Sequence, residues 1–167
     1  MPDIDLHQLL REEHQRAKDR RAGDGFQDES FLPYAYVVAA DGSATIMALA
    51  LPKPMAMQAV WTQAHKDKAI AVFLSSDARI INLQRYGLSL EQAEVHRVEN
   101  LRAVGGDFGN LPREVWQDVV ITWCKGPDFP DTQIATEYSE GPEDTVVYAD
   151  SRSDAEKVTI KMLPDWW

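Results

Sequence analysis

The spacing of apolar and polar positions at the amino end predicts a helix. Residues 3–21, DIDLHQLLREEHQRAKDRR, contain no Gly or Pro and begin with Asp3 and Asp5, either of which can cap a helix. At about 100° per residue, four apolar side chains fall in one sector and should face the core: Leu6, Leu9, Leu10 and Ala17. A basic stripe on another side is interpreted as a solvated face: His7, Arg11, His14 and Lys18.

The next pattern predicts a hairpin. Residues 22–33 combine two Gly, acidic side chains and a Pro, which is typical of a connecting loop. Two apolar runs follow, over residues 34–51, and they flank the dipeptide Asp41-Gly42. Because Asp-Gly tolerates the positive φ angles of a tight turn, we expect two antiparallel strands in this segment.

A second helix and a central strand are expected after the hairpin. Residues 52–68 place Pro54 in a first helical turn and end in the basic residues that suit a helix carboxyl terminus. Four side chains at i, i+3, i+4, i+7 spacing predict the buried stripe: Met57, Val60, Trp61 and Ala64. Residues 69–74, AIAVFL, form a continuous apolar run, as in a strand that is covered on both faces.

The remainder predicts one more helix and a meander. Residues 79–87 are compatible with a short helix or a strand, whereas 89–104 have a capping-box start and stop at Gly105-Gly106. Three further strand patterns are separated by the turn-rich segments 126–131 and 139–144; they cover residues 114–125, 132–138 and 145–150. Residues 156–167 are compatible with a final strand or a docked tail.

Together these elements predict a single α+β domain over residues 1–167, with an amino-terminal helix (1–21), a connecting loop (22–33) and a body (34–167). The expected sheet is mixed or antiparallel. It has an N-terminal hairpin, a central buried strand, a C-terminal meander and about three helices packed on it.

Composition narrows the class of protein. The net charge is -10, and residues 111–167 hold twelve acidic side chains against five basic ones, which argues against general binding to nucleic-acid phosphates. No apolar run approaches the roughly 20 residues that cross a bilayer. The lone Cys124, inside a strand pattern, favours a buried inert thiol, and the amino end has no signal-peptide pattern. We therefore expect a cytoplasmic protein that does not bind membranes.

Polar residues directly after the central apolar run are the first candidates for chemistry. Ser75, Ser76, Asp77 and Arg79 follow it at once, and groups at the carboxyl end of a central strand often meet a ligand. Ser and Asp are also the preferred caps of a following helix or turn. Capping is the favoured interpretation, because a nucleophile needs a base and an orienting group that the sequence does not place beside it.

Other signatures are absent from the sequence or have an ordinary explanation. The four His are scattered, and no phosphate-binding glycine pattern occurs, so no metal and no cofactor are expected. The acidic turns lack the ligand spacing of a calcium loop. Their side chains Glu140, Glu143 and Asp144, with the terminal Trp166 and Trp167, remain candidates for binding a protein partner.

Three functions remain open from these patterns. The favoured one is a non-catalytic interaction or inhibitor-type module, whose acidic surface would steer toward a partner protein of basic charge. The alternative is a small hydrolase or transferase that uses Ser75, Ser76, Asp77 and Arg79. A homo-oligomer is the third, because a meander leaves edge strands that need pairing or protection.

Overall fold

The computed structural model describes residues 3–27, 31–81, 116–149 and 157–158. The chain divides into two compact units, one made of Met1–Ala78 with Val119–Trp167 and the other of Arg79–Asp118. The described helices and strands belong to the first unit, apart from the ends of two strands that run into the second. The expectation of one domain stays a prediction.

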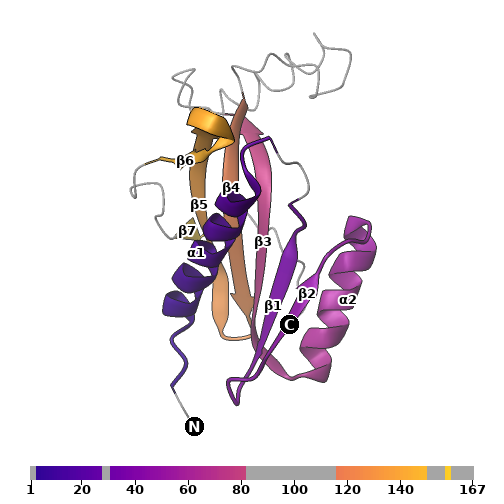
Figure 1. Ribbon diagram of the computed structural model, residues 1–167. Coiled ribbons are helices and arrows are strands. Elements are labelled where there is room, and N and C mark those ends of the chain that lie inside the picture. The colour runs from indigo at the N-terminus through magenta and orange to yellow at the C-terminus, as the bar shows by residue number, and fades with distance from the viewer. Residues whose placement is uncertain (1–2, 28–30, 82–115, 150–156, 159–167) are drawn as a thin grey trace, which may run out of the picture. The chain divides into compact units, whose positions relative to one another are not determined.

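One antiparallel sheet organises the described part of the chain (Figure 1). Its strands follow in the order β2-β1-β3-β4-β5-β6, and β7 pairs with another part of β5. The bounds are β1 Tyr34–Ala39, β2 Ala44–Ala48, β3 Ala69–Ile81, β4 Trp116–Gly126, β5 Phe129–Glu140, β6 Val146–Tyr148 and β7 Lys157–Val158. The predicted α+β class with an antiparallel sheet is therefore confirmed.

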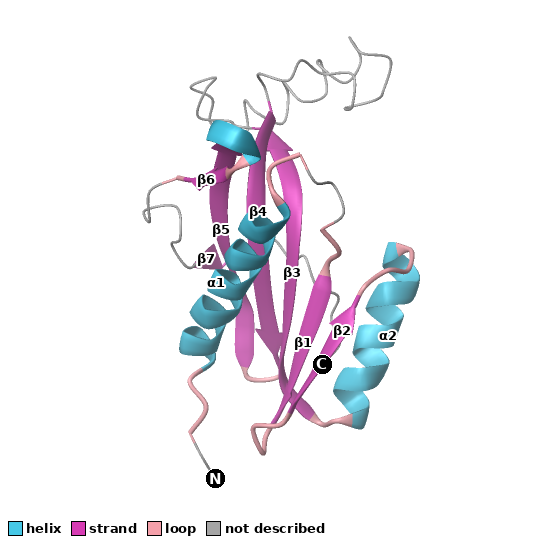
Figure 2. Ribbon diagram, in the orientation of Figure 1, coloured by secondary structure: helices cyan, strands magenta, loops and turns pink. Residues whose placement is uncertain are grey.

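Two α-helices, α1 (Leu6–Asp24) and α2 (Lys53–Lys66), cover opposite faces of this sheet (Figure 2). Alternate residues of a strand point to opposite faces. Val37 of β1 accordingly packs with α2, whereas its neighbour Val38 packs with α1. The third expected helix, 89–104, lies outside the described residues, as does the loop at Gly105-Gly106.

Strand β3 is central, as the apolar run 69–74 predicted. Val72 belongs to the core under α2, while Ala71 and Phe73 belong to the core under α1. The expected end of this strand was wrong, because β3 continues through the polar residues to Ile81. Polar side chains can stay in a strand where neighbouring elements supply hydrogen-bond partners.

Helix α1 begins and ends for local reasons. The Asp5 side chain caps it by accepting a hydrogen bond from the Gln8 amide at 3.0 Å. It ends at Asp24, three residues later than predicted, because Gly25 (φ 82°) supplies the positive φ angle that stops it. Leu10 and Ala17 are buried and Leu6 and Leu9 pack against the core, which confirms the apolar stripe.

Two side-chain placements were predicted wrongly. His14 is buried at 3% exposure and not on a solvated face, because it finds polar partners on the sheet. Trp61 is exposed, although its spacing placed it in the buried stripe of α2. Val60 and Ala64 of that stripe are buried as predicted, and Ala56 is buried beside them. Small side chains allow the helix to approach β1 closely.

The expected hairpin is present, and the three strands of the expected meander, β4, β5 and β6, are neighbours in the sheet. The Ala39 amide donates to Ser43 across the Asp41-Gly42 turn, and Gly42 adopts a φ of 84°. The turn after β4 is shorter than the predicted segment 126–131, since β5 already begins at Phe129. Val158 pairs with Thr132, so the strand alternative for the carboxyl-terminal segment is confirmed at residues 157–158.

We predict that Lys68→Gly stabilises the fold. Lys68 follows the cap of α2 with a φ of 51°, a left-handed conformation that costs a residue with a Cβ roughly 1 kcal/mol. Glycine removes this strain, and the gain in the free energy of unfolding should be about 0.5–1 kcal/mol, measured by urea denaturation. Gln58→Gly, at an exposed position in the interior of the same helix, is the control and should be destabilising by about 0.5–1 kcal/mol.

Candidate functional site

The four residues proposed as a catalytic group do not share one face of the sheet. Ser75 pairs with Tyr34 on the face that α1 covers, and Asp77 lies near Arg21 of that helix. Ser76 belongs to the opposite face, because successive residues of β3 alternate. Neither capping nor a shared site accounts for these side chains; Arg79 belongs to β3, and its side chain is outside the described part of the molecule.

Ser75 belongs instead to a buried polar network. Its hydroxyl is hydrogen-bonded to the Thr122 hydroxyl at 3.0 Å, and Thr122 is hydrogen-bonded to Nδ1 of His14 at 3.0 Å. The other ring nitrogen, Nε2, is hydrogen-bonded to the Thr136 hydroxyl at 2.7 Å. Ser75 is only 1% exposed, so a substrate does not reach its hydroxyl in this conformation.

Asp77 lies beside a second buried group, the Arg21 guanidinium. Nε of Arg21 lies 3.6 Å from an Asp77 carboxylate oxygen and donates to the Tyr138 hydroxyl at 3.2 Å. Its two terminal nitrogens donate to the carbonyls of Gly25 and Phe26, each at 2.8 Å. Burial opposes the charge, but Tyr138 and Asp77 favour it, and the pKa of Arg21 is raised. This arrangement ties α1 to the sheet.

The acidic turn is also part of the fold. Asp144 accepts a hydrogen bond from the Gln27 amide at 2.8 Å, and Glu140 accepts one from the Gln27 side chain at 3.4 Å. Glu143 is exposed, with a φ of 54°. Two of the three carboxylates thus hold the loop after α1. Trp166 and Trp167 lie outside the described residues, and all five stay predicted binding residues.

A surface that the sequence patterns did not identify lies along β2, at one end of the strand order. Residues 43–52 contain no charged side chain, in a chain of which 26% is charged. Proteins commonly protect edge strands with charges, proline or bulges. In the described part of the chain β2 pairs only with β1, and Ile46 is 68% exposed. The uncharged run at residues 43–52 is the feature of the sequence from which this surface could have been predicted.

Hydrogen bonds of the β1-β2 hairpin show which backbone groups face outward. Ala39 donates to Ser43 at 2.9 Å, and Leu49 donates to Pro33 at 2.8 Å. Antiparallel pairs alternate between bonded and non-bonded positions. The amides and carbonyls of Ala44, Ile46 and Ala48 therefore point away from β1, toward the free edge.

An open groove accompanies this edge on the α2 side. Its walls are uncharged side chains of β2, of the connection after it and of α2: Met47, Leu51, Pro54, Met55, Gln58, Ala59, Thr62 and Gln63. Met55 and Leu51 are more than half exposed. We call the free edge of β2 and this hollow the β2-α2 groove. It offers backbone partners and apolar contacts side by side.

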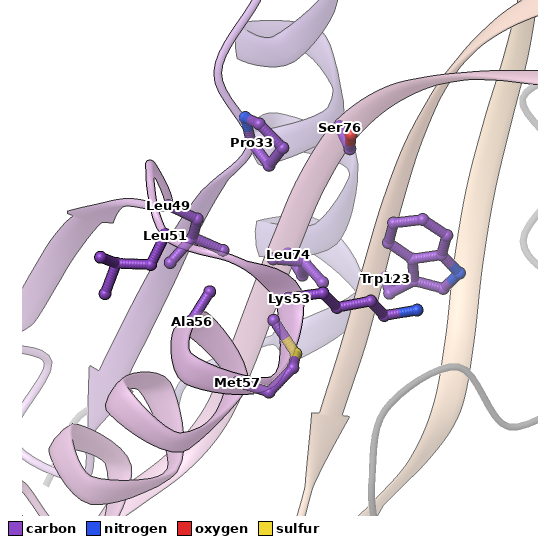
Figure 3. A pocket seen from close by; sticks show the side chains of 9 residues that line it. All are labelled: Pro33, Leu49, Leu51, Lys53, Ala56, Met57, Leu74, Ser76 and Trp123. Atoms are coloured by element: carbon purple, nitrogen blue, oxygen red, sulfur yellow. The ribbon is translucent and has the colours of Figure 1, made fainter.

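A separate cavity lies at the first turn of α2, and Ser76 is the one predicted site residue with a described side chain that lines it (Figure 3). Its volume is about 280 Å³. The other lining residues come from α2, its flanking segments and the two central strands: Pro33, Leu49, Leu51, Lys53, Ala56, Met57, Leu74 and Trp123. The cavity is largely apolar, with few polar groups.

Metal and thiol chemistry have little support. Among the described residues no group of three His, Cys, Asp or Glu side chains could hold a metal ion. Cys124 is buried, and burial raises the pKa of its thiol well above the ordinary value, so it stays protonated. His65 is at the end of α2, as predicted, and its Nδ1 is 3.0 Å from the Trp61 carbonyl.

Neither of the two described α-helices has the length and the apolar composition needed to cross a bilayer. Comparisons of the chain with protein-family models, curated proteins and solved structures found no match.

Proposed function

We propose that this protein is a non-catalytic interaction module that captures an extended segment of a partner protein along β2. The observation that carries this proposal is an uncharged edge strand with outward backbone groups at Ala44, Ile46 and Ala48. A partner segment would form a further strand beside it, which is a common mode of peptide recognition.

Side-chain specificity would come from the two faces of the added strand. Residues of the partner on one face would enter the β2-α2 groove beside Met47, and those on the other would lie beside Ile46. Because the groove lining carries no charge, the partner should present apolar side chains at alternate positions. Lysines outside such a motif would match the net charge of -10 and speed association.

The hydrolase or transferase hypothesis has weaker support. It uses Asp77 with either Ser75 or Ser76. Ser75 lies on the same face of β3 as Asp77 but is only 1% exposed, and Ser76 lies on the opposite face. Ser76 faces the cavity, but among the lining residues that the structure describes none is a His, Asp or Glu that could serve as its base.

A peptide-display experiment tests the groove. Random ten-residue peptides are selected on the full chain, and the enriched sequences should carry apolar residues at i and i+2. Ile46→Lys should weaken binding of a selected peptide by at least about tenfold, because a lysine in the middle of β2 would lose hydration against the added strand without gaining a partner. Fluorescence polarisation measures the affinity.

The matched control is Val147→Lys on β6. Val147 is also an exposed β-branched residue, at 48% exposure, on a strand at the opposite end of the strand order. It should leave peptide affinity unchanged. Equal binding by wild type and Ile46→Lys would refute the groove, and so would a dimer in sedimentation that Ile46→Lys dissociates, since β2 would then pair with a second copy.

A further inference from the structure

The cavity at the first turn of α2 is distinct in chemistry from the β2-α2 groove. Leu74 and Ser76 enter it from β3, Trp123 from β4, and Met57 from α2, so it lies between the helix and the centre of the sheet (Figure 3). Only Leu51 lines both hollows. Ligand sites in proteins are typically concave and apolar with a few polar groups that orient the ligand.

The charged group that the structure describes in the cavity lining is positive. Lys53 is the one charged residue among the nine described residues that line it. Figure 3 shows its side chain reaching from the helix toward Trp123. Lys53 forms no ion pair with any residue that the structure describes. An anionic group in the cavity would be its electrostatic complement.

Helix stability does not explain this lysine. Lys53 is the first residue of α2, which has no acidic residue in its first turn and no side-chain cap. The positive end of the helix dipole disfavours a cation at that position. A residue placed against the local electrostatic preference indicates a role outside the helix.

Trp123 adds a second unpaired donor. Its indole N–H is buried and has no hydrogen-bond partner among the described residues. Buried donors are normally paired, so this one calls for an acceptor. The Ser76 hydroxyl donates to the Asp77 carbonyl at 2.8 Å, which leaves its lone pairs free to accept.

We propose that this cavity binds a small monocarboxylate with a compact apolar body. The carboxylate would lie at Lys53, within reach of the Trp123 side of the cavity, and the apolar body would lie among Leu49, Met57 and Leu74. At about 30 Å³ per water molecule, a volume of 280 Å³ suits a ligand with on the order of ten heavy atoms. This inference does not depend on the proposed function.

The first test compares ligands that differ in the head group alone. Octanoate, octanol and octylamine are titrated into the full chain at pH 7 by isothermal calorimetry. Octanoate should bind at least about tenfold more tightly than octanol, because a charge-assisted hydrogen bond contributes that much, and octylamine should be weakest.

The second test compares variants. Lys53→Met keeps the length of the side chain and removes its charge, so it should reduce octanoate affinity at least about tenfold and leave octanol affinity unchanged. Lys53→Arg keeps the positive charge and should retain most of the octanoate affinity of the wild type. Lys66→Met, at the other end of the same helix, should bind octanoate as wild type does. Thermal unfolding of each variant confirms that the fold is intact.

Three outcomes would overturn the proposal. They are equal affinities for octanoate and octanol, undiminished octanoate binding by Lys53→Met, and no binding of any of the three ligands to the full chain. Each leaves the β2-α2 groove untouched, because the peptide experiment depends on Ile46 and not on Lys53.

Discussion

Arg21→Ala should lower the free energy of unfolding by about 3–5 kcal/mol, the largest loss expected from a single substitution outside the apolar core. Arg21 is 3% exposed and donates to two loop carbonyls and to the Tyr138 hydroxyl. Its removal would leave those acceptors and Asp77 without their cation. Urea denaturation followed by circular dichroism measures the loss.

Arg20→Ala is the control for that experiment. Arg20 precedes Arg21 on the same helix and is exposed, with its guanidinium 5.2 Å from the ring centres of Phe31 and Tyr34. Removal of its side chain should lower the free energy of unfolding by about 0.5–1 kcal/mol. Similar losses for the two variants would show that Arg21 does not anchor α1 to the sheet.

His14→Leu should cost about 2–3 kcal/mol, since it removes the shared partner of the Thr122 and Thr136 hydroxyls in a buried site. The double variant His14→Leu with Thr136→Val should lose less stability than the sum of the losses of the two single variants. The reason is that both single variants remove the same hydrogen bond, which can be lost only once. Chemical denaturation of the four proteins of this cycle measures the coupling.

His7→Leu provides the comparison for His14. His7 is exposed on the same helix and contacts the Phe129 ring at 4.8 Å. His7→Leu should change the free energy of unfolding by no more than about 0.5 kcal/mol. A double variant that is less stable by the sum of its two single losses would argue against the buried network and for independent packing contacts.

The elements that were predicted correctly are those encoded by neighbours in the chain. Asp5 caps α1 through the amide three residues on, and Gly42 turns the hairpin through its own φ angle. The run 69–74 identified a strand buried on both faces, because continuous apolarity reports two covered sides. Capping, turn geometry and periodicity act over a few residues, and a sequence displays them directly.

Candidate chemistry was harder to place, because it depends on partners distant in the chain. Ser75, Ser76 and Asp77 are adjacent in sequence, yet each meets a different environment once α1 and α2 cover opposite faces. Helical spacing put His14 with exposed basic residues, and only the hydroxyls of β4 and β5 made its burial favourable. The β2-α2 groove likewise could not be predicted from the sequence, because only the strand order shows that β2 lies at the edge of the sheet.

The sequence by itself thus determined that the two described helices, the hairpin and its turn, and the meander strands exist, and it determined the central place of residues 69–74. It did not determine the length of β3. The tertiary structure alone decided which polar groups are buried, which strand is left at the edge, and that Lys53, Ser76 and Trp123 share a cavity. The physical reason is that backbone preferences are local, whereas burial and hydrogen-bond satisfaction are properties of the surfaces that meet when the chain folds.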